Sequence, residues 1–358
     1  MTRKIKIGNT EIGGGSSVKI QSMNTTATQD AKATLEQIRQ LADCGCDITR
    51  VAVPDMQAAE ALKEICSQSP IPVVADIHFD YKLAIAAATN GAAKIRINPG
   101  NIGGADKVQA VADCCRERNI PIRVGVNSGS LDRNIIEKYG GVNADSMTES
   151  ALGAVKLLED AGFEDIVISI KSSSPRLTIE TYRCLNSKCD YPLHVGVTES
   201  GTLREGIIKS SVGIGALLAE GIGDTIRVSL TADPVEEVRA AKSILRALDL
   251  YPSGITFVSC PTCGRTKVPL IELANKVESR IQDLPYNIKV AVMGCAVNGP
   301  GEAREADIGL AGGTDEFLLF EKGKTVRKIY TTDIDAAVAE FVDEVIRVGQ
   351  GQETDKSV

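Results

Sequence analysis

The sequence is poor in aromatic rings and in imidazole groups. Its 358 residues include no tryptophan and only two histidines, and aromatic residues make up 4% of the chain. Apolar residues nevertheless make up 43%, so a sizeable core must be built mainly from small aliphatic side chains. Such a core suits helices packed closely on a parallel sheet. The length allows one large domain and one small one.

The sequence also lacks an excess of basic residues and a long apolar run. The formal net charge of -7 argues against nucleic acid as a partner, although a local basic pocket could still bind a small anion. The apolar runs are far too short to span a bilayer. The first six residues lack the apolar stretch of a signal peptide. We therefore expect no nucleic acid, no membrane and a cytoplasmic location.

Eight short β-branched runs alternate with helical stretches between about residues 17 and 248. The runs lie at 19–23, 49–53, 73–77, 94–98, 122–126, 166–170, 193–197 and 225–230. Eight βα units over this length are typical of a closed barrel. A doubly wound open sheet is the alternative, but no Gly-rich dinucleotide fingerprint follows the first run. We predict an N-terminal (β/α)8 TIM barrel, with a hairpin from the first sixteen residues at its floor.

A turn-rich segment at residues 250–254 divides the sequence. We predict a barrel domain at 1–250 that binds substrate and a small α+β domain at 251–358 that carries a metal cluster. The smaller domain is predicted to contain a strand at 255–258, a helix at about 268–282, a strand at 288–293, a Gly-rich loop, a hairpin at 317–330 and a final helix at about 333–348.

Three of the ten cysteines are spaced for metal binding. Cys260 and Cys263 follow one predicted strand, and Cys295 follows the next. A closed structural zinc site normally takes four Cys or His ligands, and this domain offers three cysteines and no histidine. Three thiolates and a weaker fourth ligand suit an iron–sulfur cluster, for which Glu302, in a Pro-Gly turn, is the obvious candidate. A structural zinc site stays open as the second reading.

Cationic residues lie inside or at the end of five predicted strands. They are Arg50, Arg96, Arg123, Lys171 and Arg227. An inward guanidinium needs a partner, because burying it unpaired costs several kcal/mol. Inward acids such as Asp76 and Glu199 could supply internal ion pairs. Phosphate is the alternative, since its oxygens match the fork of arginine. The cations outnumber these acids, which favours a phosphorylated ligand.

Polar residues also follow the predicted strands at their carboxyl ends, where barrel enzymes place their chemistry. They are Asp76, His78, Asn98, Asn127, Lys171, Thr198 and Glu199. Each is weak evidence by itself, because polar residues commonly end strands as helix caps.

With these motifs assembled, the chain resembles the 4-hydroxy-3-methylbut-2-enyl diphosphate synthase family, the reductive ring-opening enzymes of the methylerythritol phosphate route to isoprenoids. The likeness runs from residue 20 to the last helix and matches the compact two-domain bacterial form. Its most specific segments are CPTCGRT (260–266), MGCAVNGPGEA (293–303), ADIGLAGG (306–313), RINPGN (96–101), VGVNSGSL (124–131) and GIGDTIRVSL (221–230).

The resemblance implies a barrel followed by a small sulfite/nitrite-reductase-like domain that binds a 4Fe–4S cluster. The implied cluster ligands are Cys260, Cys263, Cys295 and Glu302. The implied substrate is 2-C-methyl-D-erythritol 2,4-cyclodiphosphate. Its diphosphate would be held by Arg50, Arg96, Arg123, Asn127 and Lys171.

It further implies that two electrons from reduced flavodoxin or ferredoxin open the ring and release a hydroxyl as water. Glu199, Asp76 and Glu302 are the implied catalytic residues, with Glu302 able to leave its iron and Glu199 the better candidate for proton handling. The family works as a head-to-tail homodimer. A pterin-type TIM-barrel transferase with a structural zinc domain, which needs no electrons, is the alternative function. A non-catalytic iron–sulfur carrier or sensor is a third hypothesis, which would leave the basic barrel pocket unexplained.

Overall fold

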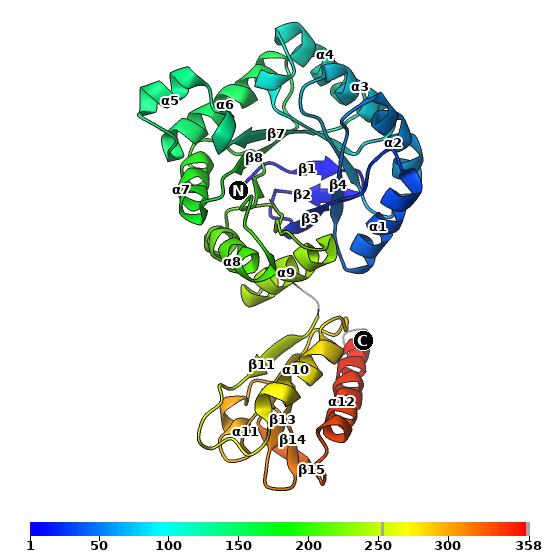
Figure 1. The fold of residues 1–358 in the computed structure, drawn as a ribbon, viewed down its shortest axis with the longest axis vertical. Helices are drawn as coiled ribbons and strands as arrows, with labels where there is room; N and C mark the ends of the chain where they lie inside the picture. Colours follow the sequence, from blue (N-terminus) through cyan, green and yellow to red (C-terminus); the bar gives the residue numbers. More distant parts are fainter. Residues whose placement is uncertain (252–253, 356–358) are drawn as a thin grey trace. The chain divides into compact units, whose positions relative to one another are not determined.

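The computed structural model describes residues 1–251 and 254–355. The chain divides between Leu250 and Tyr251 into two compact units, each described here by itself (Figure 1). Two residues of the predicted linker, Pro252 and Ser253, lie outside the described residues. Across the described ranges, every helix is too short or too polar to serve as a membrane span.

Eight parallel strands form the centre of the first unit. They are β3 (Lys19–Met23), β4 (Ile48–Ala52), β5 (Val73–Asp76), β6 (Lys94–Ile97), β7 (Ile122–Asn127), β8 (Ile166–Lys171), β9 (His194–Val195) and β10 (Thr225–Ile226). Their order in the sheet is β8-β7-β6-β5-β4-β3-β10-β9, and a parallel bridge from Ile168 to Leu193 joins its two edges. The predicted closed barrel is confirmed.

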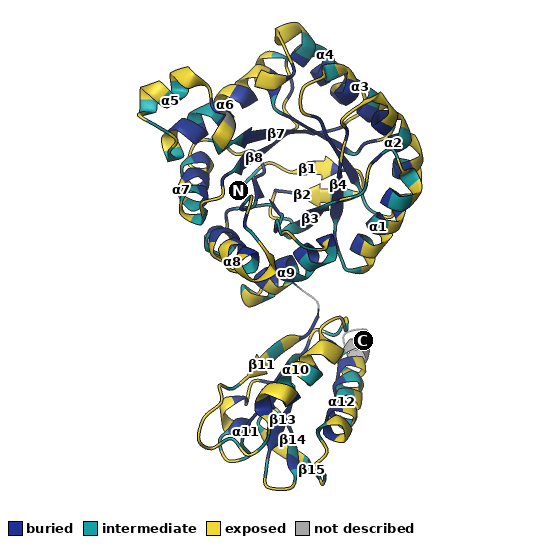
Figure 2. Cartoon of the chain, viewed as in Figure 1, coloured by how far each residue is buried: buried dark blue, intermediate teal, exposed yellow. Residues whose placement is uncertain are grey.

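The helices of this unit ring the strands (Figure 1). They are α1 (Ala31–Asp43), α2 (Met56–Gln68), α3 (Tyr81–Thr89), α4 (Ala105–Glu117), α5 (Arg133–Tyr139), α6 (Ala144–Asp160), α7 (Pro175–Asn186), α8 (Leu203–Ala219) and α9 (Pro234–Ala247), with short 3-10 turns at Pro99–Asn101 and Ser128–Ser130. Asp30, Asp55 and Asp80 cap the first three by accepting backbone N–H bonds. The helix faces turned towards the strands are buried and the outer faces exposed (Figure 2).

A hairpin of β1 (Ile5–Ile7) and β2 (Thr10–Ile12) closes the amino-terminal end of the barrel, as predicted. Ile5, Ile7 and Ile12 form a buried cluster with Ile48 and Val74, which lie near the start of their strands. An apolar plug at this end leaves the carboxyl ends of the strands for a polar site.

Two strands are shorter than predicted. β9 and β10 each contain two residues, whereas the β-branched runs extend over 193–197 and 225–230. After β10, the backbone N–H of Leu230 donates to the carboxylate of Glu237 at 3.1 Å instead of continuing a strand ladder. A side chain from α9 thus replaces a neighbouring strand as the partner of this backbone.

The second unit is a five-stranded sheet packed against helices. Its strands are β11 (Thr256–Ser259), β12 (Lys289–Met293), β13 (Ile308–Gly312), β14 (Phe317–Glu321) and β15 (Lys324–Ile329), and its helices are α10 (Leu270–Ile281), α11 (Gly299–Glu302) and α12 (Ile334–Asp355). The strands lie in chain order, the first three parallel and the rest antiparallel. Alternate residues of β12 enter two cores, one of which contains residues of α10 and α12. This is the predicted α+β domain.

The prediction of a Gly-rich loop between β12 and the hairpin is wrong in part, because β13 forms within it as the central strand. A Cβ on Gly309 would lie 2.1 Å from Cζ of Phe320, and one on Gly312 would lie 2.5 Å from Cγ2 of Val268. These glycines leave space for larger neighbours. They also remove the side chains whose alternation would have indicated a strand.

Candidate active site

Two arginines share one buried carboxylate at the end of β5. Nη1 of Arg96 lies 3.1 Å from Oδ1 of Asp76, and Nε of Arg50 lies 3.7 Å from Oδ2. Burial works to raise the pKa of Asp76, but Arg50, a hydrogen bond with His78 and Arg96 together hold this pKa well below its ordinary value. Asp76 is therefore an ionised, shared counter-ion, as one reading of the sequence predicted.

Gly125 on β7 makes room for one of these arginines. A Cβ at this position would lie 2.5 Å from Nε and 2.7 Å from Nη2 of Arg96. Any larger residue here would have to displace the guanidinium, whose fully buried side chain has little space to move. The glycine within the sequence VGVN therefore has a packing role in the charged interior.

Arg123 on β7 is a buried cation whose guanidinium makes no hydrogen bond within the described residues. Its side chain is fully buried, and Nε, Nη1 and Nη2 all lack a hydrogen-bond partner among residues 1–251 and 254–355. Burial lowers the pKa of Arg123 well below its ordinary value, and Arg50 and Arg96 lower it further. Buried donors without partners are costly, so an anion bound here would relieve a penalty that the protein itself leaves in place.

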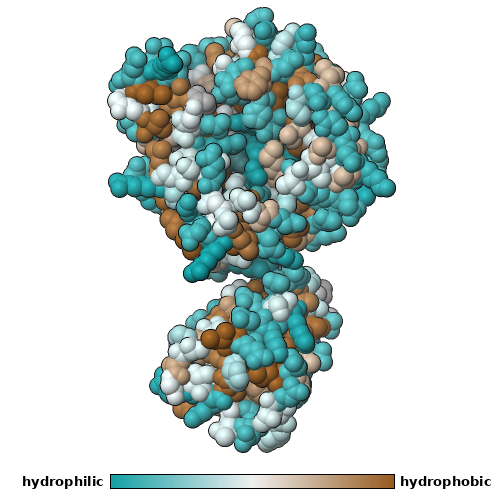
Figure 3. All heavy atoms as spheres, viewed as in Figure 1, coloured by the Kyte–Doolittle hydropathy of each residue, from teal (hydrophilic) through white to brown (hydrophobic). Residues whose placement is uncertain are grey.

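Lys171 ends β8 beside Asn127, its register partner at the end of β7. Burial, followed by the charges of Arg50, Arg96 and Arg123, lowers the pKa of Lys171 to about 6. A cavity in this region is lined by Arg50, Ser169, Ile170, Lys171, His194, Gly196, Val197, Thr198, Arg227 and Ser229. In the space-filling view, hydrophilic residues surround a hollow in the middle of the barrel unit (Figure 3).

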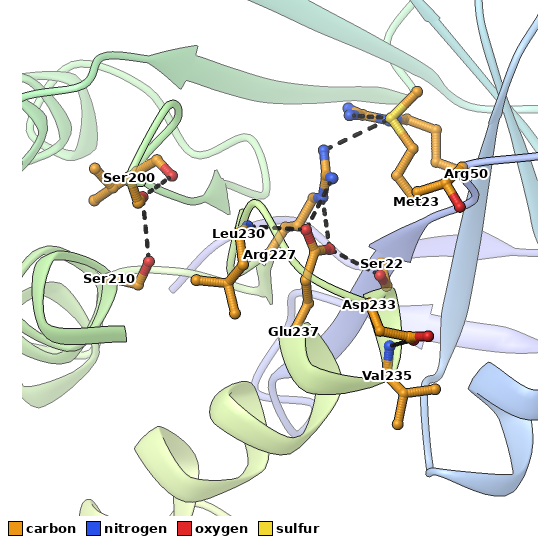
Figure 4. A network of polar contacts seen from close by, with 12 residues as sticks. Ser22, Met23, Arg50, Ser200, Ser210, Arg227, Leu230, Asp233, Val235 and Glu237 are labelled. Carbon is orange, nitrogen blue, oxygen red and sulfur yellow. Dashed lines mark hydrogen bonds and ion pairs between the residues drawn. The ribbon is translucent and has the colours of Figure 1, made fainter. Parts of the chain in front are cut away.

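A second buried acid, Glu237 on α9, was missed by the sequence analysis. Its carboxylate accepts from Nε and Nη2 of Arg227, both at 3.2 Å, and from the hydroxyl of Ser22 at 2.9 Å (Figure 4). Glu237 lies in the first turn of a helix, where an acid is commonly a solvated partner of the helix dipole. The available signal was its position beside the apolar residues Val238 and Ala241, which share its buried face.

Glu199 does not serve as an inward counter-ion. Its side chain is exposed, and its backbone adopts a left-handed conformation with φ of 51°, which is uncommon for a residue other than glycine. The two acids that compensate the barrel arginines are Asp76 and Glu237. Glu199 thus remains available for other contacts beyond the end of β9.

In the second unit, the three candidate cysteines and Glu302 line one pocket. Cys260 follows β11 directly, and Cys295 follows β12 after Gly294. Because these strands are parallel neighbours, their carboxyl ends bring the two cysteines together, as the sequence predicted. The backbone N–H of Gly294 donates to Sγ of Cys260 at 3.2 Å, and Lys267 N–H donates to the Gly294 carbonyl at 2.9 Å, which joins the two loops.

The chemistry of this pocket suits a soft metal centre. A backbone hydrogen bond from Arg265 is the main cause that lowers the pKa of Cys263, which favours the thiolate that binds metals. Three thiols with one carboxylate form a donor set of the kind that holds an iron–sulfur cluster with one distinct position. Within the described ranges, no three His, Cys, Asp or Glu side chains are close enough to hold a single metal ion.

Together these features define a barrel protein with a cavity beside several buried cations and a second unit with a thiol-lined pocket. The chain belongs to the GcpE family. Residues 2–242 match the model of the GcpE TIM-barrel domain, and residues 256–344 match that of the GcpE protein C-terminal domain. The resemblance stated from the sequence is confirmed.

Curated relatives match over nearly the whole chain. The chain is 58% identical over 344 residues to 4-hydroxy-3-methylbut-2-en-1-yl diphosphate synthase (flavodoxin) of Ruminiclostridium cellulolyticum, covering 96% of this chain and 97% of the relative. It is 56% identical to the protein of the same name from Clostridium acetobutylicum, with 97% of both chains covered.

Among solved structures, dihydropteroate synthase from Xanthomonas albilineans in complex with 7,8-dihydropteroate is similar over 70% of this chain and 99% of that chain. The TM-score is 0.47 and the sequence identity 13%. A likeness of this size supports no statement about function.

Proposed function

We infer that this chain catalyses the reaction for which its relatives are named. It converts 2-C-methyl-D-erythritol 2,4-cyclodiphosphate, two electrons and two protons into (E)-4-hydroxy-3-methylbut-2-enyl diphosphate and water. The observation that carries the inference is Arg123, whose three buried guanidinium nitrogens lack partners among the described residues. A diphosphate supplies the oxygens that such a fork binds, and the relatives' names specify the diphosphate product.

We assign the diphosphate to the cationic pocket of the barrel. Arg50 and Lys171, which line the cavity, would supply positive charges together with Arg96 and Arg123, which are buried and not among its lining residues. Asn127, beside Lys171 in the strand register, would supply an amide. The diphosphate would raise the pKa of Lys171 from about 6, because an opposite charge favours the protonated amine. Binding of the diphosphate would therefore add a proton, and with it a positive charge, to the amine of Lys171.

The two candidate acids of the barrel differ in what they can do. Asp76 is ionised and contacts Arg50 and Arg96, so we assign it to fixing these guanidinium groups rather than to donating a proton. Glu199 is exposed beyond the end of β9, where it can exchange protons with solvent. We therefore propose that Glu199 handles a proton of the reaction.

We further propose that Cys260, Cys263, Cys295 and Glu302 hold a 4Fe–4S cluster. When bound, the cluster would pass the two electrons of the reaction, one at a time, from the external donor to the substrate. Glu302 would be the weakest of the four ligands, since its carboxylate is harder than the thiolates and more readily displaced. The relatives' names include flavodoxin, which supports flavodoxin over ferredoxin as the electron donor.

Metal and sulfide analysis of protein purified without oxygen tests the proposal against its alternative. We expect about four irons and four sulfides per chain and a brown absorbance. Stoichiometric zinc without sulfide would remove the electron source and favour a pterin-type transferase with a structural zinc domain.

The family resemblance also supports a head-to-tail homodimer, in which the cluster unit of one protomer completes the barrel site of its partner. Mixing refolded or co-expressed chains carrying Arg123→Ala with chains carrying Cys295→Ser tests this proposal. In a head-to-tail dimer, each mixed dimer contains one intact site, so about a quarter of the wild-type activity returns at random pairing. If both halves of a site came from one chain, the mixture would stay inactive.

A further inference from the structure

The buried acid Glu237 accepts more hydrogen bonds than its role as the counter-ion of Arg227 requires. Four donors reach its carboxylate: Nε and Nη2 of Arg227, the hydroxyl of Ser22 and the backbone N–H of Leu230. The side chain is 5% exposed. A carboxylate held by this many partners has one orientation, and so does the guanidinium that it binds.

Glu237 leaves one nitrogen of Arg227, Nη1, without an acid as its partner. Glu237 occupies Nε and Nη2, and Nη1 points towards Met23, whose Sδ lies 3.6 Å away (Figure 4). The same sulfur accepts from Arg50 at 2.8 Å and 3.1 Å. Arg227 and Arg50 both line the cavity. Two like charges thus approach one neutral sulfur, Arg50 from β4 and Arg227 from the segment just after β10, and each contacts its own acid.

We propose that Glu237 is a positioning residue for diphosphate binding: it acts through Arg227, which lines the cavity and whose guanidinium it orients, and Ser22 fixes the carboxylate in turn. The proposal rests on the proposed function, since it assumes that the cavity takes a diphosphate. A positioned guanidinium loses less side-chain entropy when its ligand binds than a free one does.

Charge alone and positioning predict opposite effects of Glu237→Gln. Removing a negative charge from a site that binds an anion should tighten binding if only the field matters. Positioning predicts weaker binding, because an amide cannot keep both charge-assisted bonds to Arg227. Glu236→Gln is the matched control, since Glu236 is the neighbouring acid on α9 and pairs with Arg239 along the helix surface.

The experiment measures turnover of the cyclic diphosphate and the Kd for inorganic pyrophosphate, on holoenzyme handled without oxygen. We expect Glu237→Gln to raise Kd and KM on the order of 10-fold and to change kcat less, while Glu236→Gln behaves as wild type. In an Arg227→Gln background, Glu237→Gln should add little, because its effect passes through Arg227. Unchanged or tighter binding, or a full effect without Arg227, would overturn the proposal.

Ser22→Ala supplies a second variant in case Glu237→Gln folds poorly. It removes one hydrogen bond to the carboxylate and no charge, and we expect a weaker effect in the same direction. A wild-type affinity in Ser22→Ala together with a lower melting temperature would assign this network to stability alone. If wild-type holoenzyme with a full cluster fails to turn over the cyclic diphosphate, the proposed function fails, whichever way the variants behave.

Discussion

The two candidate sites of this chain are built in different ways. In the barrel, the charged groups stand on strands, lie almost wholly inside the protein and are held by buried acids: Asp76 by contact with Arg50 and Arg96, Glu237 by contact with Arg227. In the second unit, the three cysteines stand on loops after β11 and β12, Glu302 ends the short helix α11 instead of lying in the predicted Pro-Gly turn, and Cys263 and Glu302 are exposed.

The difference shows which parts of each site the protein fixes by itself. Strand residues packed among other strands keep their geometry without a ligand, so the proposed anion site of the barrel would be formed before its ligand binds. Loop residues that lie on a pocket without contacting one another acquire their final geometry from the group that they bind. Substitutions in the barrel should therefore weaken anion binding, whereas substitutions in the thiol-lined pocket should reduce the content of bound iron and sulfide.

The largest effect is expected in the second unit. Cys295→Ser should reduce iron and sulfide content and bring turnover down to background, because one of three thiolates is lost. Pyrophosphate binding by the barrel should persist. Cys184→Ser, which changes a cysteine on α7 outside the pocket, is the control and should keep its full iron content. Normal turnover in Cys295→Ser would contradict the proposal that this pocket holds the cluster.

Arg123→Ala should have the opposite pattern of effects: pyrophosphate binding is weakened and the cluster is retained. We expect the Kd for pyrophosphate to rise at least about 30-fold, as for truncation of one partner of a buried charge pair, while iron and sulfide content stay normal. Arg118→Ala is the matched control, because this arginine lies just before β7 and pairs with Glu117 at the surface. Equal affinities in the two variants would contradict a diphosphate site around Arg123.

A smaller effect concerns the proton that the enzyme takes up when the anion binds. The free enzyme has Lys171 with a pKa of about 6, so at pH 8 its amine is mostly neutral. An anion that raises this pKa must bring a proton with it, up to about one per site. Calorimetric titration with pyrophosphate in buffers of different ionisation enthalpy should show this proton uptake at pH 8. The uptake should decline below pH 6, where Lys171 is already protonated in the free enzyme. Pyrophosphate should bind more tightly as the pH is lowered from 8 to 6.

Lys171→Gln should remove most of this proton uptake. Undiminished uptake in the variant would assign the proton to another group and contradict the neutral state of Lys171.

The smallest effect is structural and separates the units. Gly309→Ala places a Cβ against the ring of Phe320 and should destabilise the second unit by about 1–3 kcal/mol, with the barrel unaffected. Gly215→Ala on α8, where nothing lies within 4 Å of the added Cβ, should be neutral or slightly stabilising. Differential scanning calorimetry checks both, and equal melting curves for the two variants would contradict the packing described for β13.

The sequence predicted the barrel because each strand carries a β-branched run, and it predicted the thiol pocket because Cys260 and Cys295 each follow a strand. It could not predict β13, whose glycines remove the alternation of side chains. It also could not assign partners inside the barrel. Glu237 lies on a helix and pairs with Arg227 and Leu230 nearby in the sequence and with Ser22 far from it, whereas Glu199, next to a strand end, is exposed. Tertiary pairing of charges depends on geometry that no local pattern records.

The central claim is that reduction and diphosphate binding belong to one reaction. The most direct test supplies anaerobic protein of known iron and sulfide content with 2-C-methyl-D-erythritol 2,4-cyclodiphosphate and reduced flavodoxin, and follows the linear diphosphate product. We predict one product for every two electrons consumed and no product without flavodoxin or another reductant. Protein with a complete cluster that binds the cyclic diphosphate but forms no product under these conditions would contradict the account.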